Sequence, residues 1–129
     1  MEFQTLLESR RSVRSYDASK TVTREQIKEI VEAGILAPSW KNSQTARYYC
    51  VIDEATKEKF AKECLPEFNI NSSKGAGAYV ITTFVANRSG FDREGNPDNE
   101  CGNGWGYYDL GLHNENVILK AKELGLDPK

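Results

Sequence analysis

Three arginines form the densest cluster of positive charge in the chain: Arg10, Arg11 and Arg14, with Ser12 between them. Guanidinium groups bind phosphate through paired hydrogen bonds, and a serine hydroxyl adds a further donor. The whole chain has 17 Lys and Arg against 19 Asp and Glu, so the cluster lies in an acidic background. The segment therefore predicts a site for a bound anion or, as the simpler alternative, a solvated basic turn.

Two further segments concentrate polar side chains. Residues 38–44 (PSWKNSQ) place amide, hydroxyl and ammonium donors behind an expected helix end, where they could hydrogen-bond a polar heteroaromatic ring. Residues 71–74 (NSSK) precede an expected strand. Taken singly, the first segment could be an ordinary polar loop and the second a linker.

No side-chain set of a self-sufficient catalyst is evident. The chain has one histidine, His113, and its spacing to Asp109 and Cys101 matches no familiar metal site. Residues 75–77 (GAG) precede a strand instead of following one, which argues against a dinucleotide-binding turn. If the protein is an enzyme, we expect a cofactor to supply the chemistry.

Composition narrows the classes of partner. The formal net charge of −2 disfavours nucleic acid, and no apolar run is long enough to suggest a membrane span. The first residues lack the pattern of a signal peptide, so we expect a cytoplasmic protein. Three cysteines without a CxxC pair indicate no zinc ribbon or redox pair, and the apolar neighbours of Cys50 and Cys64 predict buried thiols.

The 129 residues fit one domain with alternating helices and strands. Thr23 and Gln26 form a capping box that starts a helix ending before Pro38. The other expected elements are a helix over 2–9, a strand over 47–52, a helix over 54–64, a polar linker over 66–77, a strand over 79–86, a long loop over 87–104 and a helix over 105–124. Two strands are marginal alone, so either a partner chain completes the sheet or further strands lie beyond this polypeptide.

Apolar spacing predicts which helix faces are buried. In the helix over 54–64, Phe60, Ala61 and Cys64 are expected to face inward. The helix over 105–124 is apolar on more than one side, which predicts a central helix closed by Gly125 as its C-cap. Its main buried face is expected to contain Tyr107, Leu110, Gly111, Val117, Ile118, Ala121 and Leu124.

The ordered set of motifs resembles the FMN-dependent nitroreductase family. Four stretches carry the resemblance: residues 10–17 (RRSVRSYD); 36–39 (LAPS) with 42–44 (NSQ); Asn71 and Lys74 ahead of a strand; and 108–111 (YDLG) leading into 116–119 (NVIL) and 123–126 (ELGL). The resemblance implies an α+β fold, a three-layer sandwich with a central β-sheet flanked by helices, in an intertwined homodimer with FMN at the interface.

The resemblance also implies a set of FMN contacts. Arg10 and Ser12 would hold the phosphate and ribityl chain, with Arg11 adjacent, and Arg14 would approach the pyrimidine side of the ring. Pro38, Ser39 and Trp40, with Asn42 nearby, would reach the flavin of the other subunit. Asn71 and Lys74 would contact the polar edge of the ring.

The function implied is hydride transfer from NADH or NADPH through the flavin to a nitroaromatic, quinone or similar small acceptor. An alternative is a flavin-binding protein without turnover, or an inactive remnant of the same fold. A third is an unrelated α+β domain whose basic turn binds a phosphorylated partner. Because the family pattern continues past the position of Lys129, we expect residues 1–129 to be a domain that lacks its C-terminal part.

Overall fold

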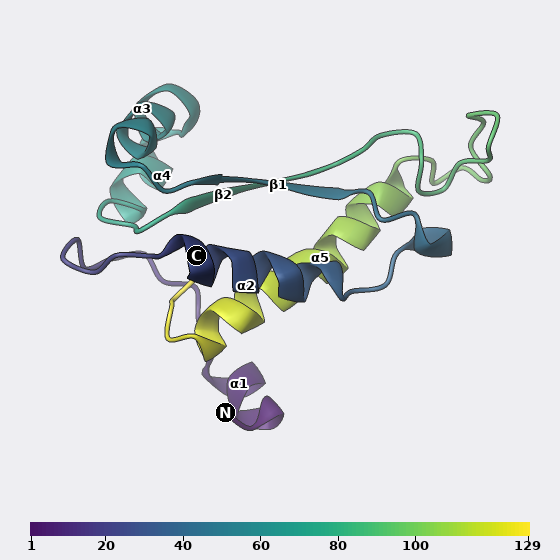
Figure 1. The fold of residues 1–129 in the computed structure, drawn as a ribbon. Coiled ribbons are helices and arrows are strands. Elements are labelled where there is room, and N and C mark those ends of the chain that lie inside the picture. Colours follow the sequence, from purple (N-terminus) through teal and green to yellow (C-terminus); the bar gives the residue numbers. More distant parts are fainter.

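The computed structural model describes all residues, Met1–Lys129, as an α+β structure (Figure 1). Helices α2 and α5 form one layer and the sheet a second, while α3 stands over one end of the sheet's other face. The elements in chain order are α1 (Phe3–Ser9), α2 (Arg24–Ile35), the 3-10 turn η1 (Trp40–Asn42), β1 (Ala46–Val51), α3 (Glu54–Cys64), α4 (Glu67–Ser72), β2 (Tyr79–Phe84) and α5 (Gly104–Glu123).

The sheet consists of β1 and β2, paired antiparallel with Tyr48 opposite Thr82. One face packs on α5, where the Tyr48 hydroxyl donates to Asn114 Oδ1 at 3.0 Å and Asn114 Nδ2 donates to Thr82 Oγ1 at 3.2 Å. Desolvation raises the pKa of Tyr48 to about 12, so its hydroxyl stays protonated and available as a donor. On the other face, Phe60 of α3 packs against Tyr79 with ring centroids 5.2 Å apart.

The apolar core lies between α2 and α5. As predicted, α2 begins with a capping box, in which Gln26 N donates to Thr23 Oγ1 at 3.1 Å and Thr23 N donates to Gln26 Oε1 at 2.9 Å. Gly34 lets the helices approach closely, because a Cβ there would lie 2.8 Å from Val117 Cγ2. The buried core residues are Ile27, Ile30, Val117 and Ala121. The prediction of a central helix is confirmed, since α5 contacts α1, α2, η1 and both strands.

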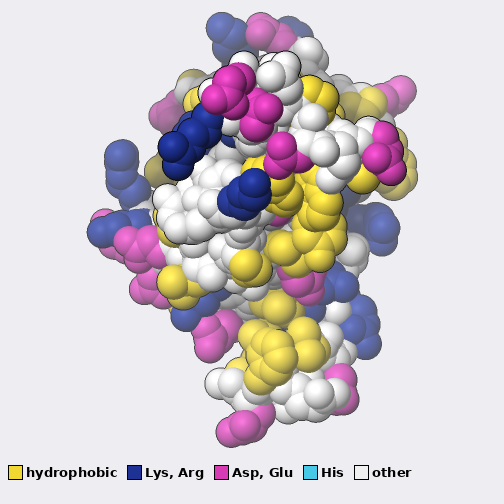
Figure 2. Space-filling model, turned by 90° about the vertical axis from the view of Figure 1, so that its right-hand side faces the viewer, with side chains coloured by type: hydrophobic (Ala, Val, Ile, Leu, Met, Phe, Trp, Pro, Cys, Tyr) yellow, Lys and Arg dark blue, Asp and Glu magenta, His cyan; other side chains and the backbone are white.

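The molecule exposes far more surface than its mass requires. Its accessible area is 8651 Å², whereas a compact monomer of this mass exposes about 6,900 Å². Several large apolar side chains contribute, including Phe3 of α1 (66% exposed), Leu36 (83%) and Tyr107 of α5 (70%). Figure 2 views the molecule from the η1 end. Hydrophobic side chains gather in the middle of this face and again on α1 at the bottom.

The structure corrects the expectation of a polar linker over 66–77. Residues Glu67–Ser72 form helix α4, so Asn71 lies in a helical turn and not in a linker. The carbonyl of Pro66 accepts hydrogen bonds from the backbone N–H groups of Asn69 and Ile70, which starts the helix. Proline is compatible with a helix start, where its missing N–H costs nothing.

The predicted burial of two cysteines is wrong: Cys50 and Cys64 are both exposed. Cys50 lies on a two-stranded sheet that is only partly covered, and Cys64 lies in the last turn of α3. In that helix the buried residue is Lys57, whose ammonium group finds two hydrogen-bond acceptors. Phe60 and Ala61 are half-buried.

The predicted inner face of α5 is only partly correct. Leu110, Val117 and Ala121 are buried, but Tyr107 and Gly111 are exposed. The buried face also contains two polar residues that hydrophobic spacing does not select, Asp109 and His113. Gly125 has φ +80°, in agreement with its expected role as a C-cap.

Candidate functional site

The predicted arginine cluster lies in an extended segment after α1. Val13 N donates to Pro128 O at 3.1 Å, which fixes the segment against the residues that follow α5. Arg10 is half-buried, whereas Arg11, Ser12 and Arg14 are exposed. Arg11 Nη1 donates at 2.7 Å to the backbone carbonyls of Glu8 and Arg10. No carboxylate lies within 4.0 Å of any of the three guanidinium groups, so their positive charge is not neutralised within the chain.

Asn71 and Lys74 lie where α4 turns toward β2. Ser73 Oγ hydrogen-bonds the Tyr79 hydroxyl at 2.8 Å, and Gly75, which follows Lys74, has φ +83°. Buried Lys57 of α3 donates to Ala76 O at 3.0 Å and to Glu54 Oε1 at 2.7 Å. The turn that presents Lys74 is therefore held from both sides. Lys74 itself is exposed and has no carboxylate partner within 4.0 Å.

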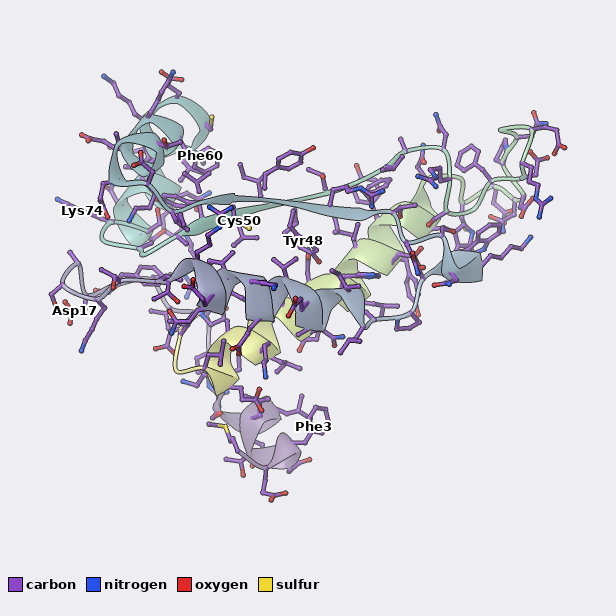
Figure 3. The ribbon with its side chains drawn as sticks, viewed as in Figure 1. Phe3, Asp17, Tyr48, Cys50, Phe60 and Lys74 are labelled. Atoms are coloured by element: carbon purple, nitrogen blue, oxygen red, sulfur yellow. The ribbon has the colours of Figure 1, made fainter.

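These two predicted segments are brought together in the structure. A Cβ on Gly75 would lie 3.1 Å from Tyr16 O and 3.3 Å from Ala18 Cβ, so the turn after α4 touches the end of the arginine segment. An open cavity of about 890 Å³ is lined by neighbours of the predicted residues, such as Val13, Tyr16 and Ser73, together with the inner face of α5 and the residues after it. The predicted residues Arg10, Arg11, Ser12, Arg14, Asn71 and Lys74 themselves do not line it. Figure 3 shows Lys74 and Asp17 at this same end of the molecule. We call this end of the molecule, which carries the arginine segment and the turn of Lys74, the charged end.

The third predicted segment, Pro38–Gln44, has an unusual backbone. Lys41, Asn42 and Gln44 have φ values of 47°, 53° and 54°, in the left-handed region that costs a non-glycine residue roughly 1–2 kcal/mol. Hydrogen bonds inside the segment stabilise it: Asn42 N to Ser39 O at 3.0 Å, Ser43 N to Trp40 O at 2.9 Å and Gln44 N to Ser39 Oγ at 3.0 Å. Ser39 and Trp40 are half-buried, while Pro38 and Asn42 are exposed. Strained backbone of this kind is often found at functional sites.

A buried carboxylate connects this segment to α5. Asp109 Oδ2 accepts from Trp40 N at 3.0 Å and from Ser89 Oγ at 2.7 Å. Ser89 Oγ in turn lies 3.3 Å from Thr45 Oγ1. Asp109, Ser89 and Thr45 are 2%, 1% and 0% exposed. We call this end of the molecule the network end.

Aromatic rings surround the same end. Trp40 lies 6.4 Å from Trp105, and Trp105 lies 6.1 Å from Tyr108. Lys41 Nζ lies 4.5 Å from the centre of the Trp40 ring and 3.5 Å from Asp98 Oδ2. The arrangement offers apolar ring faces beside hydrogen-bond donors, which suits a planar aromatic ligand.

The charged end and the network end are separated by α5. Trp40 contacts the first turns of this helix, whereas the arginine segment bonds to residues beyond its last turn. At 1.5 Å per residue, a 20-residue helix is about 30 Å long. Figure 1 shows η1 and α4 at opposite ends of the molecule. One chain therefore does not bring all the predicted residues to one place.

Sequence reasoning missed the residues that hold both ends in position. Lys57 stands among other charged residues of α3, and Asp109 was considered as a metal ligand and as part of the 108–111 stretch, with no anchoring role. The structure contains no group of three or more His, Cys, Asp or Glu side chains that could hold a metal ion. No helix has the length and apolar character needed to cross a membrane.

Comparison with known proteins identifies the class. The sequence profile of the nitroreductase family matches residues 7–127, so this chain belongs to the nitroreductase family. YdgI of Bacillus subtilis strain 168, named as an NAD(P)H nitroreductase, is 35% identical over 84 residues, 65% of this chain and 39% of YdgI. MhqN of the same organism, named likewise, is 33% identical over 72 residues, 56% of this chain and 35% of MhqN.

Solved structures of relatives have the same fold. A protein from Bacteroides thetaiotaomicron, described as an NADH dehydrogenase/NAD(P)H nitroreductase, has a TM-score of 0.72 at 27% identity, with 96% of this chain and 63% of its own covered. A protein from Desulfovibrio desulfuricans, described as a nitroreductase in complex with FMN, has a TM-score of 0.69 at 26% identity, with 94% and 62% covered. The chain thus spans less than two thirds of these relatives.

Proposed function

We propose that the protein is an FMN-dependent oxidoreductase that uses NADH or NADPH to reduce a small conjugated acceptor such as a nitroaromatic or a quinone. The observation that carries the proposal is the charged end, where the segment that carries three arginines without carboxylate partners meets, at Tyr16 and Ala18, the turn that carries Lys74. Family membership supports it, as do the FMN in the Desulfovibrio desulfuricans relative and the names of the Bacillus subtilis relatives.

The donor set of the charged end fits the chemistry of FMN. Arg10 and Ser12 would bind the phosphate and ribityl hydroxyls, with Arg11 beside them, because guanidinium and hydroxyl donors match those oxygens. Arg14, Asn71 and Lys74 would bind the polar edge of the ring. When bound, FMN would supply two-electron hydride chemistry, which no side chain of this protein provides. The cations of Arg14 and Lys74 would stabilise the negative charge that reduction places on that edge.

We further propose that the active form is a homodimer with FMN between the subunits. The network end of one chain is too far from its own charged end to share one cofactor with it, so Pro38, Ser39, Trp40 and Asn42 would serve the flavin of the partner. An accessible area about 1,800 Å² above that of a compact monomer also favours association, because a standard interface buries about 800 Å² of each partner.

The test is a flavin titration combined with reduction by NAD(P)H. We expect the purified protein to bind FMN and the bound flavin absorbance to bleach when NADH or NADPH is added. Arg10→Ala with Arg14→Ala should weaken FMN binding by about 10²–10⁴-fold, since each charged hydrogen bond contributes about 1.5–3 kcal/mol. A control with Arg24→Ala and Lys59→Ala removes the same charge from elsewhere on the surface and should bind FMN normally.

Two results would contradict the proposal. An unchanged FMN titration in the double arginine variant would refute the site. FMN that is bound but never bleached by either nicotinamide would refute the enzyme and favour a flavin-binding protein without turnover.

A further inference from the structure

We propose that Asp109 is a positioning residue for FMN binding: it anchors the segment Pro38–Gln44 so that Ser39 and Trp40 are presented to the cofactor. This inference rests on the proposed function, in which that segment contacts the flavin of the partner subunit. Asp109 would touch neither the cofactor nor a substrate. It would act through the backbone N–H of Trp40.

The hydrogen bonds at Asp109 have one consistent direction. Ser89 has a single hydroxyl hydrogen, and its 2.7 Å bond to Asp109 Oδ2 uses it, because an ionised carboxylate only accepts. The 3.3 Å contact between Thr45 and Ser89 therefore has Thr45 as the donor. Asp109 terminates this chain and also accepts from Trp40 N. It thereby joins three segments that are far apart in the sequence.

The bond from Trp40 to Asp109 differs from the other hydrogen bonds of the segment. Those of Asn42, Ser43 and Gln44 N–H groups all end on Ser39 or Trp40, inside the segment. They define its internal shape but do not fix where it lies. The Trp40 N–H is the backbone donor that reaches α5, across 69 positions of sequence. Without it, the strained segment keeps its internal bonds but loses its backbone bond to α5, which leaves the Trp40–Trp105 contact and the exposed Lys41–Asp98 ion pair to place it.

Burial makes this anchor strong. Asp109 is 2% exposed, and a charged acceptor makes hydrogen bonds about twice as strong as a neutral one. If the anchor is weakened, the segment occupies the binding-competent position for a smaller fraction of the time. The apparent dissociation constant rises in inverse proportion to that fraction.

Asp109→Asn is the variant that tests the role. Asparagine keeps the shape and one acceptor oxygen but removes the charge. Asp98→Asn is the matched control, because it removes a negative charge near the same segment, from the Lys41 ion pair that is 3.5 Å long and solvent-exposed. Ser89→Ala is a second variant that removes one donor and leaves the carboxylate, in case Asp109→Asn folds poorly.

Two measurements separate anchoring from binding. Hydrogen exchange of the Trp40 amide reports the anchor without any cofactor, and FMN titration reports the consequence. In Asp109→Asn we expect Trp40 exchange to accelerate about tenfold and the FMN dissociation constant to rise about fivefold to tenfold. Ser89→Ala should show smaller changes in the same direction, and Asp98→Asn should stay within about twofold of the unsubstituted protein.

The outcomes distinguish this inference from the proposed function. Unchanged Trp40 exchange in Asp109→Asn overturns the inference. So does faster exchange with unchanged FMN affinity, if the double arginine variant still loses FMN. Unsubstituted protein that binds no FMN overturns the proposed function and the inference with it.

Discussion

The two ends of α5 present the proposed ligand-binding groups in opposite ways. At the charged end, Arg11, Arg14 and Lys74 are exposed side chains on segments whose backbone is fixed nearby. At the network end, the buried Asp109 holds a strained loop in place through the Trp40 N–H. In this loop, Lys41 and Asn42 have left-handed backbone conformations. The first arrangement provides charge, and the second provides geometry.

This difference suggests a division of labour within the proposed dimer. Long cationic side chains can adapt to a phosphate from several positions, so they tolerate small backbone displacements. A loop that approaches a planar ring through its backbone, a serine and a rigid tryptophan ring tolerates little displacement, and it needs a rigid base. Asp109 and its partners would supply that base on one subunit, while the arginines of the other subunit supply most of the affinity.

Packing of α5 on β2 gives the largest expected effect at the network end. A Cβ on Gly106 would lie 2.4 Å from two atoms of the Phe84 ring, whereas a Cβ on Gly111 of the same helix would meet nothing within 4 Å. We expect Gly106→Ala to lower the free energy of unfolding by about 1–3 kcal/mol through overpacking. Gly111→Ala should raise it by roughly 0.5–1 kcal/mol through helix propensity. Urea denaturation of both variants measures the difference.

Equal stability of the two glycine variants would contradict this prediction. If Gly106→Ala is as stable as Gly111→Ala, the close contact between α5 and β2 does not exist in solution. The register that places Asp109 under Trp40 would then lose its support.

A smaller effect is expected from the residue that supports the charged end. Lys57→Met keeps the length of the buried side chain but removes the donor to Ala76 O. We expect the free energy of unfolding to fall by about 1–2 kcal/mol. FMN affinity should weaken only a few-fold, because the turn that presents Lys74 loosens while its charge remains.

Lys59→Met is the control, because Lys59 lies on the same helix but is exposed. Both variants lose one positive charge, so the difference between them reports the buried hydrogen bonds of Lys57. Urea denaturation measures the difference in stability, and FMN titration measures the difference in affinity. Equal FMN affinities and equal stabilities in the two variants would show that Lys57 does not hold the turn.

The charged end could be predicted from the sequence because its signals are local. Arg10, Arg11 and Arg14 are neighbours in the chain, and their excess of charge over an acidic background is visible without a fold. The elements flanking them were predicted for the same reason. The capping box of Thr23 and Gln26, which starts the helix after them, depends on residues three positions apart.

The network end could not be predicted in detail because its bonds join distant residues. Asp109 meets Trp40 and Ser89 only after α5 has packed on the sheet, and its place in the 108–111 stretch did not predict its burial or its hydrogen-bond partners. Helical periodicity instead selected Tyr107 and Gly111 for the inner face, and both are exposed. Helix α4 was missed because it is short and polar, and it depends on contacts of Ser73 with Tyr79.

A mixed-dimer titration tests most directly the claim that the two ends of one chain serve different cofactors. One subunit carries Arg10→Ala with Arg14→Ala, and the other carries Asp109→Asn. Each homodimer has two defective sites. In a mixed dimer with shared sites, one site combines both defects, and the other combines an intact charged end with an intact network end.

We predict that mixing the two variants restores one site of unsubstituted FMN affinity for every mixed dimer, seen as a new tight phase in the flavin titration. Failure to recover any tight phase, with formation of the mixed dimer confirmed by native mass spectrometry, would contradict the account. Each chain would then bind FMN with its own residues alone.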